Sequence, residues 1–184
     1  MVSLYLSDFI YMSQMTVNPK TSSLELFSCL VDRLAQGPVV LAIVTATQGN
    51  VASRVGEKLL VWGDAQSAGS LTENTVKAMV ITQSFEVLKT GLSQRMVIDP
   101  GDNMFAVSSV PNADKSIDQV HLWLTRWQGE DAIASAQATL ATLKAAQPSR
   151  LIVPLVTGQF PYIITRDLPS LRNLQGQDAY IEEL

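Results

Sequence analysis

The chain has 184 residues, of which 47% are hydrophobic and 16% are charged, and its formal net charge is -4. This composition can bury a sizeable core and excludes a chain that is disordered as a whole. The acidic balance, without any basic block, argues against nucleic acid or an anionic membrane surface as a partner.

Few residues are available for covalent or metal chemistry. The chain has one cysteine, Cys29, and one histidine, His121, which excludes an internal disulfide framework and a site built from several histidines. A G-x-S-x-G motif, a P-loop and a dinucleotide fingerprint are also lacking. These observations favour a non-catalytic protein and leave an enzyme with an unrecognised catalytic pair as the last alternative.

The N-terminal segment, residues 1–20, is apolar but lacks the basic start of a signal peptide. No apolar run approaches the roughly 20 residues that a helix needs to cross a bilayer. We therefore expect a cytoplasmic protein without a membrane span. The segment fits either a strand or a helix, and we expect it to pack on the domain or on a second copy.

The first predicted element is a helix over residues 22–36. Ser22 and Glu25 fit a capping box at its start, and apolar residues recur at helical spacing. Gly37 and Pro38 then end it.

Two strands and a second helix follow. The continuous apolar run at 39–46 is typical of a strand buried on both faces. A loop marked by Gly49 and Gly56 leads to a second strand at 58–62, and a helix is predicted over 71–89. Only part of this helix is polar, so we expect it to pack on two sides, the second against a copy of the chain. This helix and the apolar N-terminus predict a homodimer.

The second half of the chain reads as a meander of strands followed by a helix and two further strands. The predicted ranges are strands at 95–98, 104–110 and 119–127, a helix at 130–147, and strands at 150–156 and 160–165. The mixed order predicts an α+β fold, or α/β with a mixed sheet. We expect a single domain over 21–165, with helices packed on a mixed, partly antiparallel sheet, and a polar tail at 166–184 that is loose or forms a short helix.

The loop between the first two strands is the best candidate for a ligand site. Arg54 and Lys58 supply two cations. Ser70 and Glu73 fit a capping box, so the N–H groups of a helix start would lie near the loop. The alternative is a surface hairpin with solvated charges. The acidic Glu73 counts against an anion here.

The region from Leu24 to Gly91, about a third of the chain, resembles the N-terminal domain of the XdhC/CoxI family, the accessory proteins of xanthine dehydrogenase and related molybdenum enzymes. The family pattern is a strand, a G-S-x-P-R-x-x-G loop, a basic residue, a strand, and G-S-x-x-G-G-C-x-E at a helix start. The matching segments here are Gly49–Gly56, Lys58 and Gly69–Lys77.

The glycine framework matches this pattern, whereas the reactive positions differ. In the first loop Asn50 replaces the family's serine, Ala52 its proline and Ser53 its arginine. In the second loop, Glu73 and Asn74 replace the paired glycines, Thr75 the cysteine and Lys77 the glutamate. Residues 92–184 carry no nucleotide-binding fingerprint of the kind that longer family members have. The chain is identified as a diverged member.

The resemblance implies a protein that binds molybdenum cofactor (molybdopterin), or helps to deliver it to a molybdenum hydroxylase. Arg54 and Lys58 would hold the phosphate. The full set of residues implied in cofactor binding is Gly49, Asn50, Ser53, Arg54, Gly56, Lys58, Ser70 and Thr75. The lost cysteine and glycines favour the alternative, an interaction or regulatory module that keeps the fold and binds no ligand.

Overall fold

The computed structural model describes residues 23–63, 65–100, 118–165 and 179–183. The helices are α1 (Ser23–Leu34), α2 (Asn74–Thr90) and α3 (Glu130–Lys144). The strands are β1 (Val39–Gln48), β2 (Lys58–Trp62), β3 (Gln66–Gly69), β4 (Gln94–Ile98), β5 (Gln119–Trp127), β6 (Ser149–Pro154), β7 (Tyr162–Thr165) and β8 (Ala179–Glu183). None of the described helices is both long and apolar enough to cross a membrane.

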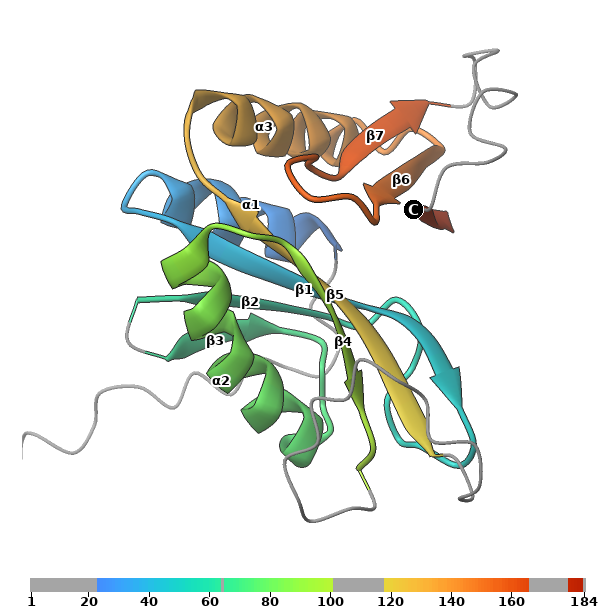
Figure 1. The fold of residues 1–184 in the computed structure, drawn as a ribbon. Coiled ribbons are helices and arrows are strands. Elements are labelled where there is room, and N and C mark those ends of the chain that lie inside the picture. The colour runs from blue at the N-terminus through green and yellow to red at the C-terminus, as the bar shows by residue number, and fades with distance from the viewer. Residues whose placement is uncertain (1–22, 64, 101–117, 166–178, 184) are drawn as a thin grey trace, which may run out of the picture.

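These strands form two sheets. The larger has the order β3-β2-β1-β5-β4 and the smaller has the order β7-β6-β8. Every pairing among the described strands is antiparallel, so the α+β prediction is confirmed and the parallel component of a mixed sheet is not found in this part of the chain. Figure 1 shows α2 on one side of the larger sheet, and α1, α3 and the smaller sheet on the other.

The central strand β1 is buried on both faces, as its apolar run predicts. Successive side chains of a strand point to opposite faces. Val40, Ala42 and Val44 accordingly join the core under α2, whereas Val39, Leu41 and Ile43 join the core under α1. Both faces are covered although the sheet is antiparallel, which explains an uninterrupted hydrophobic run in the middle of a sheet.

Strand β5 alternates in the same way. Its two tryptophans, Trp123 and Trp127, lie in the core on the α1 side. The Trp127 ring makes an edge-on contact with Phe27 of α1, with 6.5 Å between ring centroids, and a tilted contact with Phe160 at 5.4 Å. Aromatic pairs in such arrangements stabilise beyond the area they bury. Both tryptophans of β5 are therefore buried in the core on this side of the sheet.

Two predictions need correction, and one strand was not predicted. Residues 66–69 form strand β3, which the sequence did not indicate, and α2 begins at Asn74 rather than at residue 71. Residues 179–183, expected in a loose tail or short helix, form β8. The expectations for residues 1–20, Ser22 and the strand at 104–110 lie outside the described residues.

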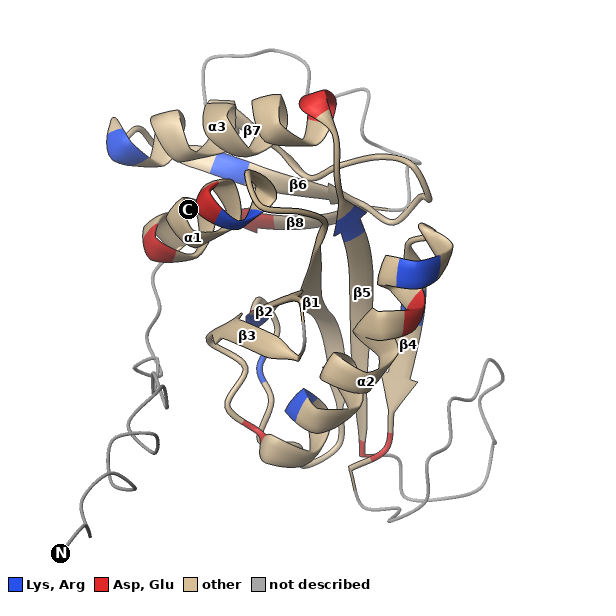
Figure 2. Cartoon of the chain, turned by 90° about the vertical axis from the view of Figure 1, so that its left-hand side faces the viewer, with Lys and Arg blue, Asp and Glu red and all other residues tan. Residues whose placement is uncertain are grey.

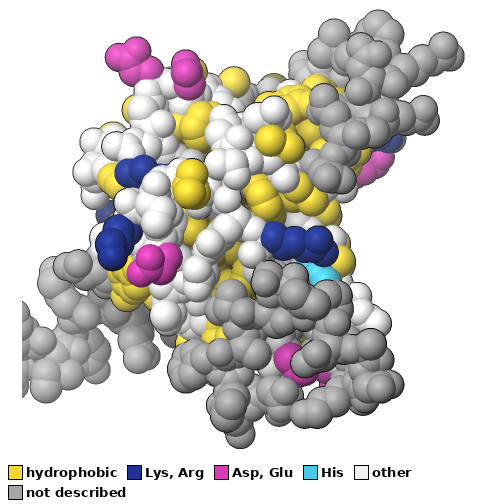
Figure 3. All heavy atoms as spheres, viewed as in Figure 1, with side chains coloured by type: hydrophobic (Ala, Val, Ile, Leu, Met, Phe, Trp, Pro, Cys, Tyr) yellow, Lys and Arg dark blue, Asp and Glu magenta, His cyan; other side chains and the backbone are white. Residues whose placement is uncertain are grey.

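The second apolar side of α2 is partly exposed, because Ile81 and Leu88 still pack against the core. Val76, Val80 and Val87 are buried on the sheet, whereas Phe85 is 40% exposed. Figure 3 shows scattered hydrophobic side chains and few charges on the face of the molecule that Figure 1 presents.

Candidate functional site

The predicted ligand loop, residues 49–57, is closed by backbone hydrogen bonds. The N–H of Gly56 donates to the carbonyl of Val44, and the N–H of Val44 donates to the carbonyl of Glu57, both at 2.9 Å. Gly49 and Gly56 have φ values of 76° and 90°, a region that favours glycine. The glycines therefore shape the loop as the sequence predicts.

Lys58 lies at the first position of β2, and its side chain points away from solvent. Alternation places it on the same face as Leu60, which belongs to the core under α1. Lys58 is only 5% exposed. Its ammonium donates to the Gly56 carbonyl at 2.9 Å and lies 2.7 and 2.6 Å from the two carboxylate oxygens of Glu182. The main cation of the predicted phosphate site is thus neutralised by a residue of β8.

Strand β8 also closes the loop sterically. A Cβ placed on Gly56 would lie 3.1 Å from the Tyr180 hydroxyl. Burial, with a smaller contribution from the Glu182 charge, raises the pKa of Tyr180 to about 12, so this hydroxyl is protonated at neutral pH. The next acidic residue, Glu183, accepts two hydrogen bonds from Arg150 of β6 at 3.0 and 2.7 Å. The basic position on β6 and the acidic positions on β8 are visible in Figure 2.

A second carboxylate occupies the other half of the predicted site. Glu73 accepts hydrogen bonds from the backbone N–H of Ser53 at 3.1 Å and from its hydroxyl at 2.7 Å. Glu73 is the N-cap residue of α2 but makes no side-chain cap hydrogen bond. The predicted capping box is therefore wrong, because the glutamate satisfies the loop instead of the helix.

Ser70 joins the same site through the backbone of Lys58. Its hydroxyl accepts from the Lys58 N–H at 3.0 Å, and its own N–H donates to the Lys58 carbonyl at 2.8 Å. The backbone passes so close that a Cβ on Gly69 would collide with the Lys58 carbonyl oxygen. Ser70 thus anchors the end of β3 on β2 and does not begin a helix.

The remaining predicted residues do not converge on one ligand position. The N–H of Asn50 donates to the Asp118 carboxylate at 2.8 Å, on the side of β5. Arg54 and Thr75 have exposed side chains. The structure therefore joins Gly56, Lys58 and Ser70 to Glu182 in one hydrogen-bonded group. Ser53 pairs with Glu73 in a second group, and the other predicted residues belong to neither.

Glu57 is a further acidic residue of the loop, and the charge of Glu73 acts on it. One oxygen of its carboxylate is buried without a hydrogen-bond partner. Burial raises the pKa of Glu57 above 4.5; Arg54 opposes this shift, and the Glu73 charge adds to it. An additional anion at this end of the loop would meet like charge.

The fit of a phosphate to these residues is poor in this structure. Lys58 already holds one carboxylate, the Ser53 donors hold another, and Arg54 is the only cation of the loop left exposed. Within the described ranges no group of three His, Cys, Asp or Glu side chains is placed to hold a metal ion.

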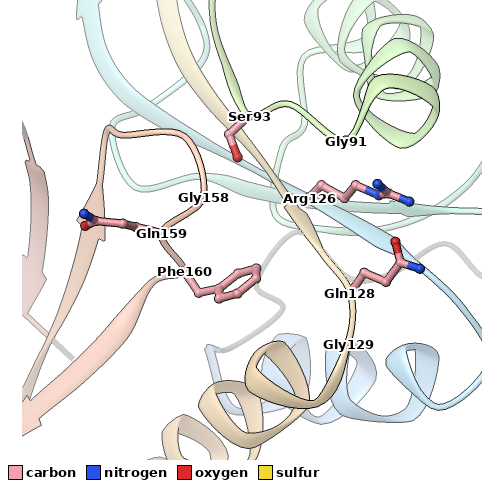
Figure 4. A pocket seen from close by; sticks show the side chains of 8 residues that line it. All are labelled: Gly91, Ser93, Arg126, Gln128, Gly129, Gly158, Gln159 and Phe160. Atoms are coloured by element: carbon pink, nitrogen blue, oxygen red, sulfur yellow. The ribbon is translucent and has the colours of Figure 1, made fainter.

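A cavity of about 400 Å³ lies elsewhere, between the end of α2, the end of β5 and the turn before β7. Arg126, Ser93 and Phe160 contribute to its walls, and none of the predicted site residues does. Figure 4 shows Arg126 extending from β5 along one side of this cavity, with Phe160 on the other. The Nε atom of Arg126 is buried without a partner.

The geometry thus defines an α+β protein whose loop has the framework of an anion site but is filled by its own carboxylates. Residues 33–99, from the end of α1 through β4, match the XdhC and CoxI family. The family resemblance predicted from the loop is confirmed over this region.

Among solved structures, the chain is similar to one described as a xanthine dehydrogenase from Bacillus halodurans. The TM-score is 0.58 at 15% sequence identity, and the alignment covers 77% of this chain and 43% of that chain. The likeness at this identity establishes the fold, and the chain spans less than half of that protein's length. No curated protein matches the chain.

Sequence reasoning missed the residues that fill the site. Glu182 and Tyr180 come from a segment without a clear periodic pattern, and Lys58 precedes its partner by 124 residues. A usable signal did exist for Glu73, which stands where the family has glycine. A carboxylate at that position is a candidate substitute for a bound anion.

Proposed function

We propose that this chain is a non-catalytic accessory protein of a molybdenum hydroxylase system, and that it works by contact with the partner enzyme rather than by carrying the molybdenum cofactor. The family match over residues 33–99 supports the accessory role. The observation that carries the second part is the ion pair between Lys58 and Glu182. A cytoplasmic location belongs to the same proposal.

The ion pair opposes cofactor binding for an electrostatic reason. A cofactor phosphate would have to displace the Glu182 carboxylate from a lysine that is 5% exposed. The released carboxylate gains hydration, but the phosphate loses more because its charge is larger. A phosphate bound instead at the Ser53 donors would have to displace the Glu73 carboxylate, whose charge also acts on Glu57. The remaining cation, Arg54, is solvent-exposed, where a charge pair is worth little.

Cofactor binding is the second candidate function, and two observations favour it. The glycine turns of the loop are retained, and the Arg54 side chain is exposed and available to a ligand. Arg54 and Lys58 would then hold the phosphate, with Asn50 and Ser53 beside them, and the cofactor would supply the redox chemistry to the enzyme that receives it.

Titration calorimetry with molybdopterin separates the two candidates. We expect no binding by the wild-type chain at micromolar concentration. Binding by the wild type that Arg54→Ala weakens by about tenfold or more would replace our proposal with the cofactor function.

Co-expression with a molybdenum hydroxylase tests the accessory role itself. We expect the chain to raise the fraction of active enzyme, and we expect Arg54→Ala to do so equally well, because contact rather than phosphate binding carries the effect. An active fraction that is the same with and without the chain would contradict an accessory role.

A further inference from the structure

The chain binds its own C-terminal strand as a receptor would bind a peptide. The β8-binding site consists of β6, the glycine turn at Gly56, and the two cations Lys58 and Arg150. We propose that this site also accepts an acidic, extended segment of a partner protein, and that β8 is the internal competitor for it. This inference rests on the proposed function, which acts through protein contact, and it names the surface and the chemistry of the partner.

The first part of the argument is the way in which β8 is recognised. It pairs antiparallel with β6, with Ile181 opposite Ile152 and Tyr180 opposite Val153. Strand addition of this kind supplies affinity through the backbone, while alternate side chains supply specificity. Tyr180 packs against the core on the α1 side and over Gly56.

Charge complementarity supplies the second part. Glu182 meets the buried ammonium of Lys58 with both carboxylate oxygens within 2.7 Å. Glu183 meets Arg150 through two hydrogen bonds. The site therefore selects an extended segment with an aromatic residue two positions before a glutamate, followed by a second acid.

The third part concerns how readily β8 can be exchanged. It is a five-residue strand at the edge of the smaller sheet, and β6 is its one partner among the described strands. Its outward residue Ile181 is 46% exposed. Short edge strands are the elements to which another chain adds most readily. The segment also lies outside residues 33–99, so the lysine of the family region is paired by a part of the chain that the family match does not include.

A carboxylate fits this site better than a phosphate. Lys58 offers one buried positive charge, which one carboxylate balances. A more highly charged anion would carry negative charge that this one lysine does not balance. The chemistry therefore favours an acidic peptide over a free phosphate group.

The test uses a fluorescent peptide that copies residues 177–184, QDAYIEEL, and fluorescence anisotropy on the full chain. In the wild type, tethered β8 holds the site at high effective concentration and masks it. The double variant Tyr180→Ala with Glu182→Gln removes the two β8 side chains that contact the site and leaves β6, Lys58 and Arg150 unchanged in sequence. We expect it to bind the peptide at least tenfold more tightly than the wild type does. Ile181→Ala, on the outward side of the same strand, is the matched control and should behave as the wild type.

The contact with Lys58 is tested by changing the peptide, because a substitution of the buried Lys58 itself could also unfold the protein. A peptide with glutamine in place of the glutamate that corresponds to Glu182 should bind the double variant at least tenfold more weakly. Circular dichroism establishes that each protein variant is folded.

Three results would overturn the proposal. The first is a folded double variant that binds neither peptide. The second is inorganic phosphate displacing the peptide at equal concentration, which would make this a small-anion site. The third is a wild-type dimer that Glu182→Gln dissociates, which would assign the site to a second copy. Because the co-expression assay does not involve the peptide, its outcome tests the accessory role separately.

Discussion

Lys58 and Glu182 form a buried ion pair between the two sheets, and such pairs behave differently from surface pairs. Two charges lose hydration on burial, and their attraction repays this only when geometry and further hydrogen bonds are favourable. Lys58 has both a carboxylate and the Gly56 carbonyl as acceptors. The pair therefore specifies where β8 docks more than it adds to stability.

The first prediction follows from the difference between removing one charge of a buried pair and removing both. Glu182→Gln leaves Lys58 buried without a counter-charge, and should lower the free energy of unfolding by about 1–3 kcal/mol. Removing both charges, with Lys58→Met and Glu182→Leu, should bring stability back to within about 1 kcal/mol of the wild type. Urea unfolding measures both values.

The control is the surface ion pair between Arg150 of β6 and Glu183 of β8. The side chains of Arg150 and Glu183 are 32% and 64% exposed. Glu183→Gln should therefore cost no more than about 1 kcal/mol. Equal losses in the single and double Lys58 and Glu182 variants would mean that packing, and not an unpaired charge, causes the effect.

The second prediction concerns Glu57, whose pKa burial raises above its ordinary value of 4.5. A carboxyl with a raised folded-state pKa binds its proton more tightly in the folded protein. This tighter proton binding stabilises the folded protein fully below pH 4.5, and the stabilisation is lost as the pH rises through the folded-state pKa. Glu57→Gln should increase the free energy of unfolding at pH 7, by at most about 1 kcal/mol for this half-exposed group.

The same variant should show no gain below about pH 4, where the wild-type carboxyl is protonated in both states. Chemical unfolding at pH 3.5 and pH 7 gives the comparison. A gain of the same size at both values would trace the effect to packing instead of ionisation.

At the scale of elements, apolar patterning predicted most of the structure. The run at 39–46 predicted β1, and the strand predicted at 119–127 is β5. Strand β3 was not predicted because its residues, Gln66–Gly69, have no apolar alternation. Its conformation comes from pairing with β2 and from the close approach of Gly69 to that strand, which are tertiary effects.

Gly69 provides the third prediction. Its φ is 156° and any Cβ would meet the backbone of Lys58 and Leu59. Gly69→Ala should therefore lower the free energy of unfolding by about 1–3 kcal/mol and detach β3 from β2. Gly37→Ala is the matched control, because nothing lies within 4 Å of a Cβ there.

Thermal unfolding compares the two glycine variants, and hydrogen exchange at the amide of Ser70 reports on β3. Ser70 donates to the Lys58 carbonyl in the wild type. An alanine at residue 69 that leaves both stability and this protection unchanged would contradict the close approach.

Across the whole molecule, the site was predictable only in its framework. The turns at Gly49 and Gly56 could be located because glycine marks them. Whether Lys58 is available to a ligand depends on Glu182, which lies on β8 of the smaller sheet and pairs with Lys58 across the fold. A pairing between two single charges far apart in the chain produces no periodic pattern in the sequence. Lys58 was therefore predicted to be available to a ligand.

Assembly is the last prediction, and it concerns the partly exposed side of α2. Phe85 is 40% exposed, and Ile81 and Leu88 are half-buried beside it. We expect a homodimer through this side of the helix. Truncation or charge at an aromatic anchor typically costs 2 kcal/mol or more, about thirtyfold in affinity. Phe85→Lys should therefore give a monomer in sedimentation at micromolar concentration, whereas Thr82→Lys on the polar side of α2 should remain dimeric. A wild-type chain that sediments at 20.0 kDa would rule out this dimer, and dissociation by both lysine variants alike would show that added charge, and not the loss of Phe85, is responsible.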